Sequence, residues 1–280
     1  GLIKSFKARL QNRRGPKVLQ VYYDLFKLLA KDSVVSPTVS WIFAVAPFVY
    51  LSAAFAAAAL APLYTGIAAG LPVRFTDLFV LLYLFALGRF FLALASLDSG
   101  SAFGGMGGSR EMFISTLVEP ALLLALLTVA FKGHSTALAG MAAAAGTPGL
   151  AAFFAAIAFF MVLIAETGRI PVDNPDTHLE LTMVHEGMVL EYSGRRLGLI
   201  VWASAIKQLV MMVLFISLFF PWPAANLPVA GQLVLFVVKL VVCAAALALS
   251  ETLTNKMRLF KIPGFMAVAG LLALLAIVAQ

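Results

Sequence analysis

Seven long apolar runs are the feature that most constrains what this chain can fold into. Each has about 17 to 24 predominantly apolar residues, the length that an α-helix needs to cross roughly 30 Å of hydrocarbon. They lie at Trp41–Leu63, Phe75–Leu97, Phe113–Phe131, Leu150–Ala165, Leu197–Phe220, Val229–Ser250 and Ile262–Val278. The runs do not alternate polar and apolar residues, which favours helices over a barrel. We therefore expect an all-α, polytopic membrane helix bundle with seven transmembrane helices, forming a single integral membrane domain over residues 1–280.

The basic residues predict how these helices are oriented. Hydrophobic residues make up 62% of the chain and charged residues only 12%, which excludes a soluble globular protein. Eight of the twenty Lys and Arg residues precede the first run, and others follow in alternate loops at Arg110, Arg169 and Lys256. The positive-inside rule places these segments on the cytoplasmic side of the cell inner membrane. The net charge of +7 then reflects topology and contact with the lipid bilayer, and we infer no nucleic-acid binding.

The first forty residues form a basic, amphipathic segment that we expect on the cytoplasmic surface. Over residues 18–31 the polar side chains Gln20, Asp24, Lys27 and Lys31 are spaced by 4, 3 and 4, with apolar residues on the other face. This spacing is typical of a helix that lies in the membrane interface or packs against another subunit, and the sequence does not decide between the two.

The single cysteine, Cys243, constrains the chemistry. An iron–sulfur cluster, a structural zinc or a nickel–iron centre each needs several soft ligands, and one cysteine inside an apolar run does not supply them. We therefore expect no cofactor in this chain, and any redox chemistry belongs to a partner.

An acidic segment, residues 166–196, gathers six of the thirteen carboxylates and two of the three histidines between two apolar runs. Asn174 followed by proline predicts a helix start, and a break is expected before Tyr192–Gly194. "HEGMV" at His185 is not a zinc-peptidase motif, because the second histidine of H-E-x-x-H would fall on Val189. We therefore expect no metal site here.

Two interpretations of these acids stay open. They form a solvated loop whose charges pair with Arg169, Arg195 and Arg196, or their crowding raises some pKa values so that they exchange protons near neutral pH.

Five charged residues fall inside the apolar runs or at their ends, and they are candidates for an ion path. Ionisable groups at membrane depth cost several kcal/mol and normally face a protein interior or a wet cavity. For Arg89 and Glu251 the alternative is that they lie near helix ends and extend to the membrane surface. The five are Arg89, Glu119, Lys207, Lys239 and Glu251.

Four motifs resemble a known family. They are "RRGP" at Arg13, "GGSRE" at Gly107, "AETGRIPVDNPDTHLEL" from Ala165 and "EYSG" at Glu191, in an order that spans nearly the whole chain. The sequence resembles the membrane subunit shared by respiratory complex I and the group 4 nickel–iron hydrogenases, which include the formate hydrogenlyases. That family usually has eight helices, so the resemblance implies that a first helix, before the basic segment, is missing from this chain.

The resemblance implies a non-catalytic subunit of an energy-converting redox complex. In that family the acidic loop lies against the peripheral redox arm, where electron transfer is coupled to movement of protons or sodium ions. The implied partners are hydrogenase large-subunit-like and iron–sulfur small-subunit-like peripheral proteins, which hold the iron–sulfur clusters and the nickel–iron centre, and antiporter-like membrane subunits. The implied junction residues are Glu166, Arg169, Asp173, Asp176, Glu180, Glu191 and Arg195.

Two departures from the quinone-reducing pattern favour the hydrogenase branch. They are "THLELTMVHEGMVLEYSG" from Thr177 and "KMRLFKIPGF" from Lys256. The alternatives are a quinone-site subunit of NADH:quinone oxidoreductase and a passive membrane anchor for a hydrogenase. A stand-alone secondary transporter is less favoured, because the chain has no internal repeat.

Overall fold

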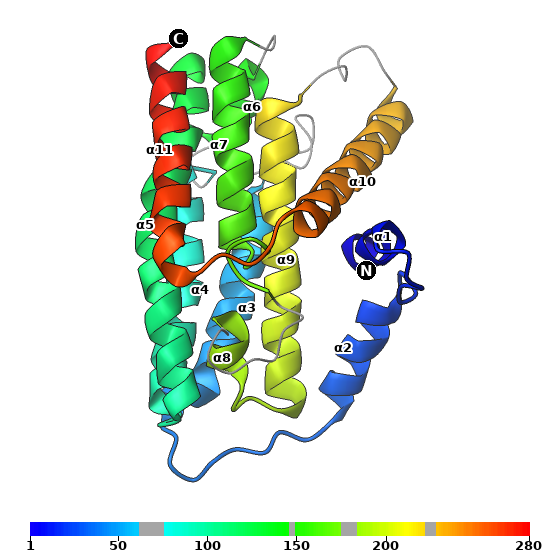
Figure 1. The fold of residues 1–280 in the computed structure, drawn as a ribbon, viewed down its shortest axis with the longest axis vertical. Helices are drawn as coiled ribbons and strands as arrows, with labels where there is room; N and C mark the ends of the chain where they lie inside the picture. Colours follow the sequence, from blue (N-terminus) through cyan, green and yellow to red (C-terminus); the bar gives the residue numbers. More distant parts are fainter. Residues whose placement is uncertain (62–75, 146–148, 175–183, 222–227) are drawn as a thin grey trace.

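The computed structural model describes residues 1–61, 76–145, 149–174, 184–221 and 228–280, and the regular elements of these ranges are helices (Figure 1). Six helical segments are long and apolar enough to cross a membrane, and a shorter apolar helix, α7 (Leu150–Glu166), has 17 residues. The six are α3 (Trp41–Leu60), α4 (Leu78–Asp98), α5 (Ala102–Gly133), α9 (Gly194–Phe219), α10 (Val229–Leu253) and α11 (Ile262–Val278) with the 3₁₀ turn before it. The chain is a multi-pass, all-α membrane protein.

The expected apolar runs coincide with these helices, and α5 differs most. It begins at Ala102, well before the expected Phe113, so its first turns run through a glycine-rich stretch. Glycine is a poor helix former, so the sequence did not predict this part of the helix. The short helix α8 (His185–Val189) packs there so closely that a Cβ on Gly107 would lie 2.8 Å from the Met188 nitrogen. Tertiary packing therefore both extends the helix and requires the glycine.

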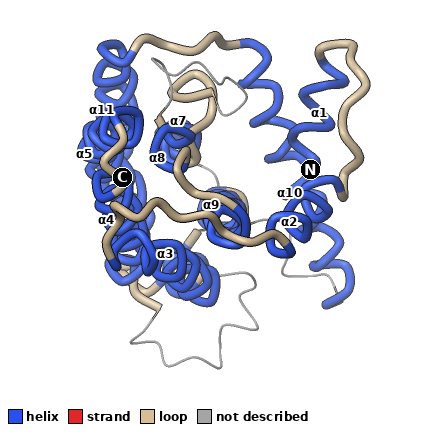
Figure 2. Tube along the Cα trace, turned by 90° about the horizontal axis from the view of Figure 1, so that it is seen from below, coloured by secondary structure: helices blue, strands red, loops and turns tan. Residues whose placement is uncertain are grey.

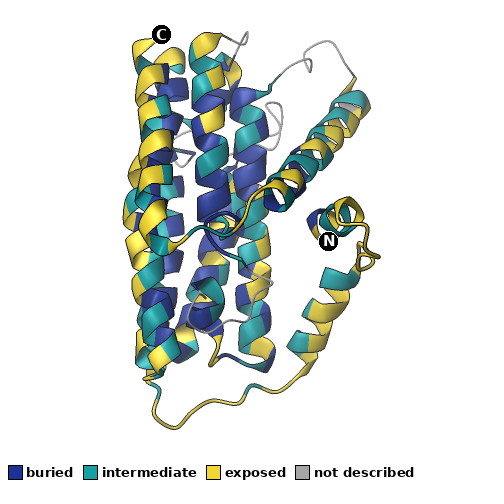
Figure 3. Cartoon of the chain, viewed as in Figure 1, coloured by how far each residue is buried: buried dark blue, intermediate teal, exposed yellow. Residues whose placement is uncertain are grey.

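Helix α9 lies in the middle of the bundle. Figure 2 shows α3, α4, α5 and α11 along one side of it and α10, α1 and α2 on the other. Two buried apolar clusters hold the helices together, a larger one built mainly from α5, α7, α9 and α11 and a smaller one from α3, α4 and α9. Figure 3 shows the buried residues on the inner faces of the helices and the exposed ones on the outer faces. Many of the exposed residues are large and apolar, as expected for helices that face lipid.

Helix α10 leans away from the bundle at its start and contacts α1 (Leu2–Leu10), a helix that the sequence did not predict (Figure 1). It has the smallest buried share of the six candidate spans, 22%. Near the middle of α10, Lys239 Nζ donates to the Phe220 carbonyl at 2.6 Å. Because α9 ends at Phe219, the lysine supplies a cation to the electronegative end of that helix.

The expected amphipathic helix is present as α2 (Gln20–Ala30). It packs on the start of α9, where a Cβ on Gly198 would lie 3.2 to 3.3 Å from Leu28 and Leu29. Tyr22 and Phe26, which share the apolar face, remain exposed. The helix therefore packs against its own chain with part of its apolar face and presents the rest outward.

The expected break before α9 is confirmed, because α8 ends at Val189 and α9 begins at Gly194. Gly194 has a φ of 52°, and a Cβ there would lie 2.1 Å from the Asp32 carbonyl oxygen, so this position requires glycine. The helix expected to start after Asn174 falls on residues 175–183, which lie outside the described residues. Helix α6 (Leu138–Ala144) follows α5 at the end of the bundle away from α8 (Figure 1).

Tyr192, of the "EYSG" motif, closes a gap in a neighbouring helix. Residue 47 of α3 is a proline and has no N–H, so the Phe43 carbonyl lacks its usual intrahelical donor. The Tyr192 hydroxyl donates to that carbonyl at 2.9 Å, and its ring stacks on Phe43 with centroids 3.9 Å apart. Burial raises the pKa of the Tyr192 phenol. The motif thus joins the segment before α9 to the start of α3.

Candidate functional site

Glu166, the last residue of α7, is the centre of a buried ion network. Its side chain is 2% exposed, and its Oε1 accepts from Lys207 Nζ of α9 at 2.8 Å and from Arg89 Nη2 of α4 at 2.5 Å. Lys207 also lies over the Phe85 ring, with its nitrogen 5.9 Å from the centroid. One carboxylate therefore holds two cations from two other helices.

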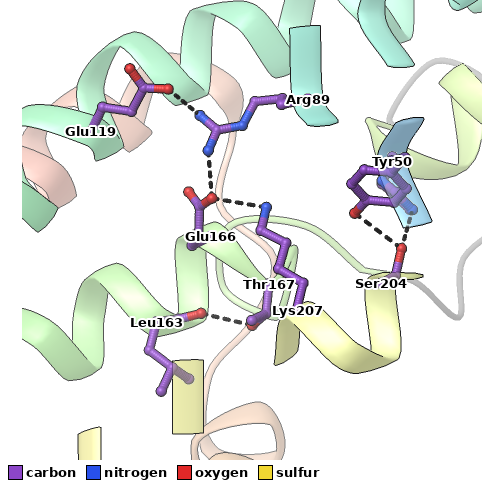
Figure 4. A network of polar contacts seen from close by, with 9 residues as sticks. Tyr50, Arg89, Glu119, Leu163, Glu166, Thr167, Ser204 and Lys207 are labelled. Atoms are coloured by element: carbon purple, nitrogen blue, oxygen red, sulfur yellow. Dashed lines mark hydrogen bonds and ion pairs between the residues drawn. The ribbon is translucent and has the colours of Figure 1, made fainter. Parts of the chain in front are cut away.

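Arg89 extends the network to α5. Its Nη1 donates to Glu119 Oε1 at 2.9 Å, so the planar guanidinium bridges two carboxylates (Figure 4). The Arg89 side chain is 5% exposed, whereas Glu119 is 49% exposed and faces outward from the middle of α5. The alternative considered for Arg89, that it extends to the membrane surface, is wrong, because the side chain is buried and pairs with Glu119 and Glu166.

The four charges of this network, from α4, α5, α7 and α9, sum to zero. Burying ions is costly unless opposite charges and hydrogen bonds compensate, and this pairing supplies both. Arg89 Nε is buried and has no hydrogen-bond acceptor in the described part of the chain. Such a donor is typical of a site where an internal water completes the bonding.

A second cluster adjoins the first. Arg169 donates through Nη1 to Glu251 Oε1 of α10 and through Nη2 to Gln208 Oε1 of α9, both at 2.8 Å. Lys7 Nζ of α1 lies 3.3 Å from the second Glu251 oxygen. The Glu251 side chain is 1% exposed, so the alternative considered for it, that it extends to the membrane surface, is also wrong. Gln208 follows Lys207 directly, which makes the two clusters neighbours along α9.

Asp173 anchors the segment after α7. Its Oδ1 accepts from Lys256 Nζ at 2.7 Å and from the Asn174 amide at 2.8 Å, and its Oδ2 accepts from the His185 amide at 3.3 Å. The Met257 amide donates to the Pro171 carbonyl in the same region, at 2.8 Å. Asp173 therefore ties the start of the acidic loop to α8 and to the link between α10 and α11.

The structure separates the acids that the sequence places together. Glu166 and Asp173 are buried in ion pairs with Arg89, Lys207 and Lys256, so for these two the alternative of a solvated loop paired with its own arginines is wrong. Glu191 and Arg195 are exposed, and Arg195 Nη2 lies 4.0 Å from Asp32.

Other predicted residues lie elsewhere or are not described. Asp176 and Glu180 fall outside the described residues. Lys239 lies near the middle of α10 and donates to the carbonyl of Phe220 at the end of α9, apart from both clusters.

Three polar residues of these clusters were not predicted: Lys7, Gln208 and Lys256. Gln208 had a recognisable signal, a polar side chain beside Lys207 inside an apolar run, whereas the partners of the two lysines depend on how distant helices pack. Among the described residues no group of three or more His, Cys, Asp or Glu side chains could hold a metal ion.

The fold and these clusters define a class: a polytopic helical membrane protein whose spans share buried, mutually neutralising ion pairs. The sequence matches the family described as NADH dehydrogenase over residues 1–280, and the chain belongs to this family, which is that of a complex I membrane component. It is 37% identical over 267 residues to formate hydrogenlyase subunit 4 of Escherichia coli (strain K12), which covers 92% of this chain and 85% of that protein.

Two further relatives lie in different branches of the family. Hydrogenase-4 component C of the same organism is 37% identical, over 81% of this chain and 71% of that protein. An NADH-quinone oxidoreductase subunit of Syntrophotalea carbinolica is 31% identical, over 75% of this chain and 68% of that protein.

A solved structure has the same fold. A chain of the membrane-bound sulfane sulfur reductase, an archaeal respiratory membrane complex, superposes with a TM-score of 0.86 at 19% identity, covering 99% of this chain and 92% of that one.

Proposed function

We propose that this chain is the membrane subunit of a multi-subunit energy-converting redox complex of the hydrogenase or formate hydrogenlyase type. It docks the peripheral redox arm and couples electron transfer there to translocation of protons or sodium ions. The observation that carries the proposal is the network Glu119–Arg89–Glu166–Lys207, which crosses four membrane helices and begins where α7 meets the acidic loop.

The network has the features that charge transfer needs. Its ion pairs share the Arg89 and Glu166 side chains, and Arg89, Glu166 and Lys207 are buried, so a change in the charge of one group alters the energy of its neighbours. Arg89 Nε and Gln208 Nε2, buried donors without a protein acceptor in the described residues, are suited to internal water. Glu119 brings a charge to the outer face of α5, where a neighbouring antiporter-like membrane subunit would cover it.

The acidic loop is the proposed docking surface. Asp173 and α8 fix its described ends, and the exposed Glu191 and Arg195 present charges outward for the peripheral arm. Asp176 and Glu180 belong to this proposal by their sequence motif alone, since they lie outside the described residues. The positive-inside rule supports a cytoplasmic position for this loop in the cell inner membrane.

The redox centres would lie in partner subunits. Cys243, the single cysteine of the sequence, is buried inside α10, and one thiol does not supply the ligands that an iron–sulfur cluster needs. The names of the relatives at 37% identity, a formate hydrogenlyase subunit and a hydrogenase-4 component, support a hydrogenase-type arm. The family resemblance implies that large-subunit-like and small-subunit-like partner proteins would hold its nickel–iron centre and iron–sulfur clusters.

The quinone-site alternative remains, because a relative at 31% identity carries the name NADH-quinone oxidoreductase. The higher identity to the hydrogenase components and the loop "THLELTMVHEGMVLEYSG" favour the hydrogenase branch. A passive anchor is the second alternative, and it predicts that the buried charges do not affect ion movement.

Replacement of Glu119 by Gln tests the proposal in the assembled complex. This side chain is half-exposed, so the amide keeps a hydrogen bond to Arg89 and the fold survives. In sealed vesicles we expect proton uptake per electron to fall while the complex still assembles and the arm still turns over. Asp24→Asn, an exposed carboxylate on α2, is the matched control and should leave uptake unchanged.

Normal uptake per electron in Glu119→Gln, in a correctly assembled complex, would support the passive anchor and refute the coupling role. Quinone-dependent turnover that a quinone-site inhibitor abolishes would instead favour the NADH:quinone oxidoreductase alternative.

A further inference from the structure

A second polar connection runs beside the ion network. The Tyr50 hydroxyl of α3 lies 3.3 Å from Ser204 Oγ of α9, and His185 Nε2 of α8 lies 3.4 Å from the same oxygen. Tyr50 is 6% exposed. Figure 4 shows Tyr50 and Ser204 beside Lys207 and the Glu166 network. The three side chains therefore join α8 to two membrane helices.

Tyr50 contacts both helices that supply cations to Glu166. On one side its ring fits against Gly88, where a Cβ would lie 2.8 Å from Tyr50 Cδ2, and the next residue of α4 is Arg89. On the other side it bonds Ser204, which is three residues before Lys207 and thus on the same face of α9. The tyrosine therefore sets the separation of α4 and α9 at the level of the two cations.

His185 connects this separation to the cytoplasmic loop. It is the first residue of α8, its amide bonds Asp173, and its imidazole bonds Ser204. The rest of α8 rests on α5 through backbone contacts between Gly187 and Gly107. A shift of α8 would thus change the Ser204 contact directly.

We infer that His185, Ser204 and Tyr50 form a brace that positions Arg89 and Lys207 around Glu166 according to the seating of α8. This inference rests on the proposed function in one respect: the brace would transmit the effect of arm docking to the ion network. Its members are positioning residues. They act through their hydrogen bonds. A side chain that does not titrate but still forms the hydrogen bond to Ser204 should therefore replace His185. Among the described residues, Asp173 accepts from the His185 amide and Glu186 follows His185 in the sequence, and neither takes part in the contact between His185 and Ser204.

The first measurement does not depend on ion transport. In the assembled complex, hydrogen–deuterium exchange of residues 185–189 should accelerate about fivefold in Tyr50→Phe and in Ser204→Ala, the factor that corresponds to about 1 kcal/mol. Gly88→Ala, which displaces the Tyr50 ring, should act in the same direction. Tyr83→Phe, an exposed tyrosine on α4, is the matched control and should exchange as the wild type does.

The second measurement is proton uptake per electron in sealed vesicles. Tyr50→Phe and Ser204→Ala should lower it at normal assembly, and Ser204→Thr, which keeps the hydroxyl, should restore it. His185→Gln should couple as the wild type does, because the amide reaches Ser204. His185→Leu should lower proton uptake per electron, because leucine has no group that bonds to Ser204.

Unchanged exchange of α8 in Tyr50→Phe and Ser204→Ala would overturn the brace. Loss of coupling in His185→Gln with normal exchange would overturn it too, because the histidine would then transfer protons. Comparison with Glu119→Gln separates the two proposals. If proton uptake per electron falls in Glu119→Gln but not in Tyr50→Phe, the brace fails and the proposed function stands. If uptake per electron is normal in both variants, the proposed function is refuted.

Discussion

The bond between Tyr192 and Phe43 allows a prediction whose size follows from the structure. Replacing Tyr192 by Phe keeps the ring stack but removes the hydroxyl that donates to the Phe43 carbonyl, and the usual helical donor is missing because residue 47 is a proline. A buried carbonyl left without a partner costs about 1–3 kcal/mol. We therefore expect Tyr192→Phe to lower the free energy of unfolding by about 2 kcal/mol.

The same reasoning predicts that this loss depends on the proline. In Pro47→Ala the backbone N–H of residue 47 becomes available, and it satisfies the Phe43 carbonyl within the helix. In that background Tyr192→Phe should cost less than about 0.5 kcal/mol, which gives a coupling energy of about 1.5 kcal/mol between the two positions.

Thermal unfolding of the purified protein in detergent, for the wild type, the two single variants and the double variant, measures this coupling. A loss of about 2 kcal/mol corresponds to a fall in Tm of roughly 4 °C or more for a chain of this size. Tyr23→Phe, an exposed tyrosine on α2, is the control and should not change the Tm. Equal losses for Tyr192→Phe in both backgrounds would refute the role assigned to the proline.

Three further perturbations have expected outcomes. Glu166→Gln leaves two buried cations with one carboxylate fewer and should lower stability in the same unfolding assay by about 3–5 kcal/mol, with partial recovery on adding Lys207→Met. Gly107→Ala should lower the Tm through its clash with α8, whereas Gly105→Ala, with its nearest neighbour 3.9 Å away, should not; equal effects would contradict the packing described. A reporter fused at Gln280 should be active only outside the cytoplasm, and cytoplasmic activity would reverse the topology.

The positions of the membrane helices were predictable because their length and apolar composition are local properties. The last helix was expected at Ile262–Val278 and has these bounds, and the others differ by a few residues except α5. Its first turns escaped prediction because glycine lowers local helix propensity, and only the contact between Gly107 and α8 explains why they are helical.

The charged residues show the opposite relation. The sequence by itself determined that the charged groups inside the apolar runs would need protein partners, because no water solvates an ionisable group in the hydrocarbon. These groups are Arg89, Glu119, Lys207 and Glu251. The sequence did not determine the partners, because the paired side chains lie far apart in the sequence: Arg89 and Glu119 are 30 positions apart, and Arg169 and Glu251 are 82 positions apart. Only the packing of the helices, which depends on side-chain shape across the whole bundle, decided that Glu166 turns inward to two cations while Glu191 stays at the surface.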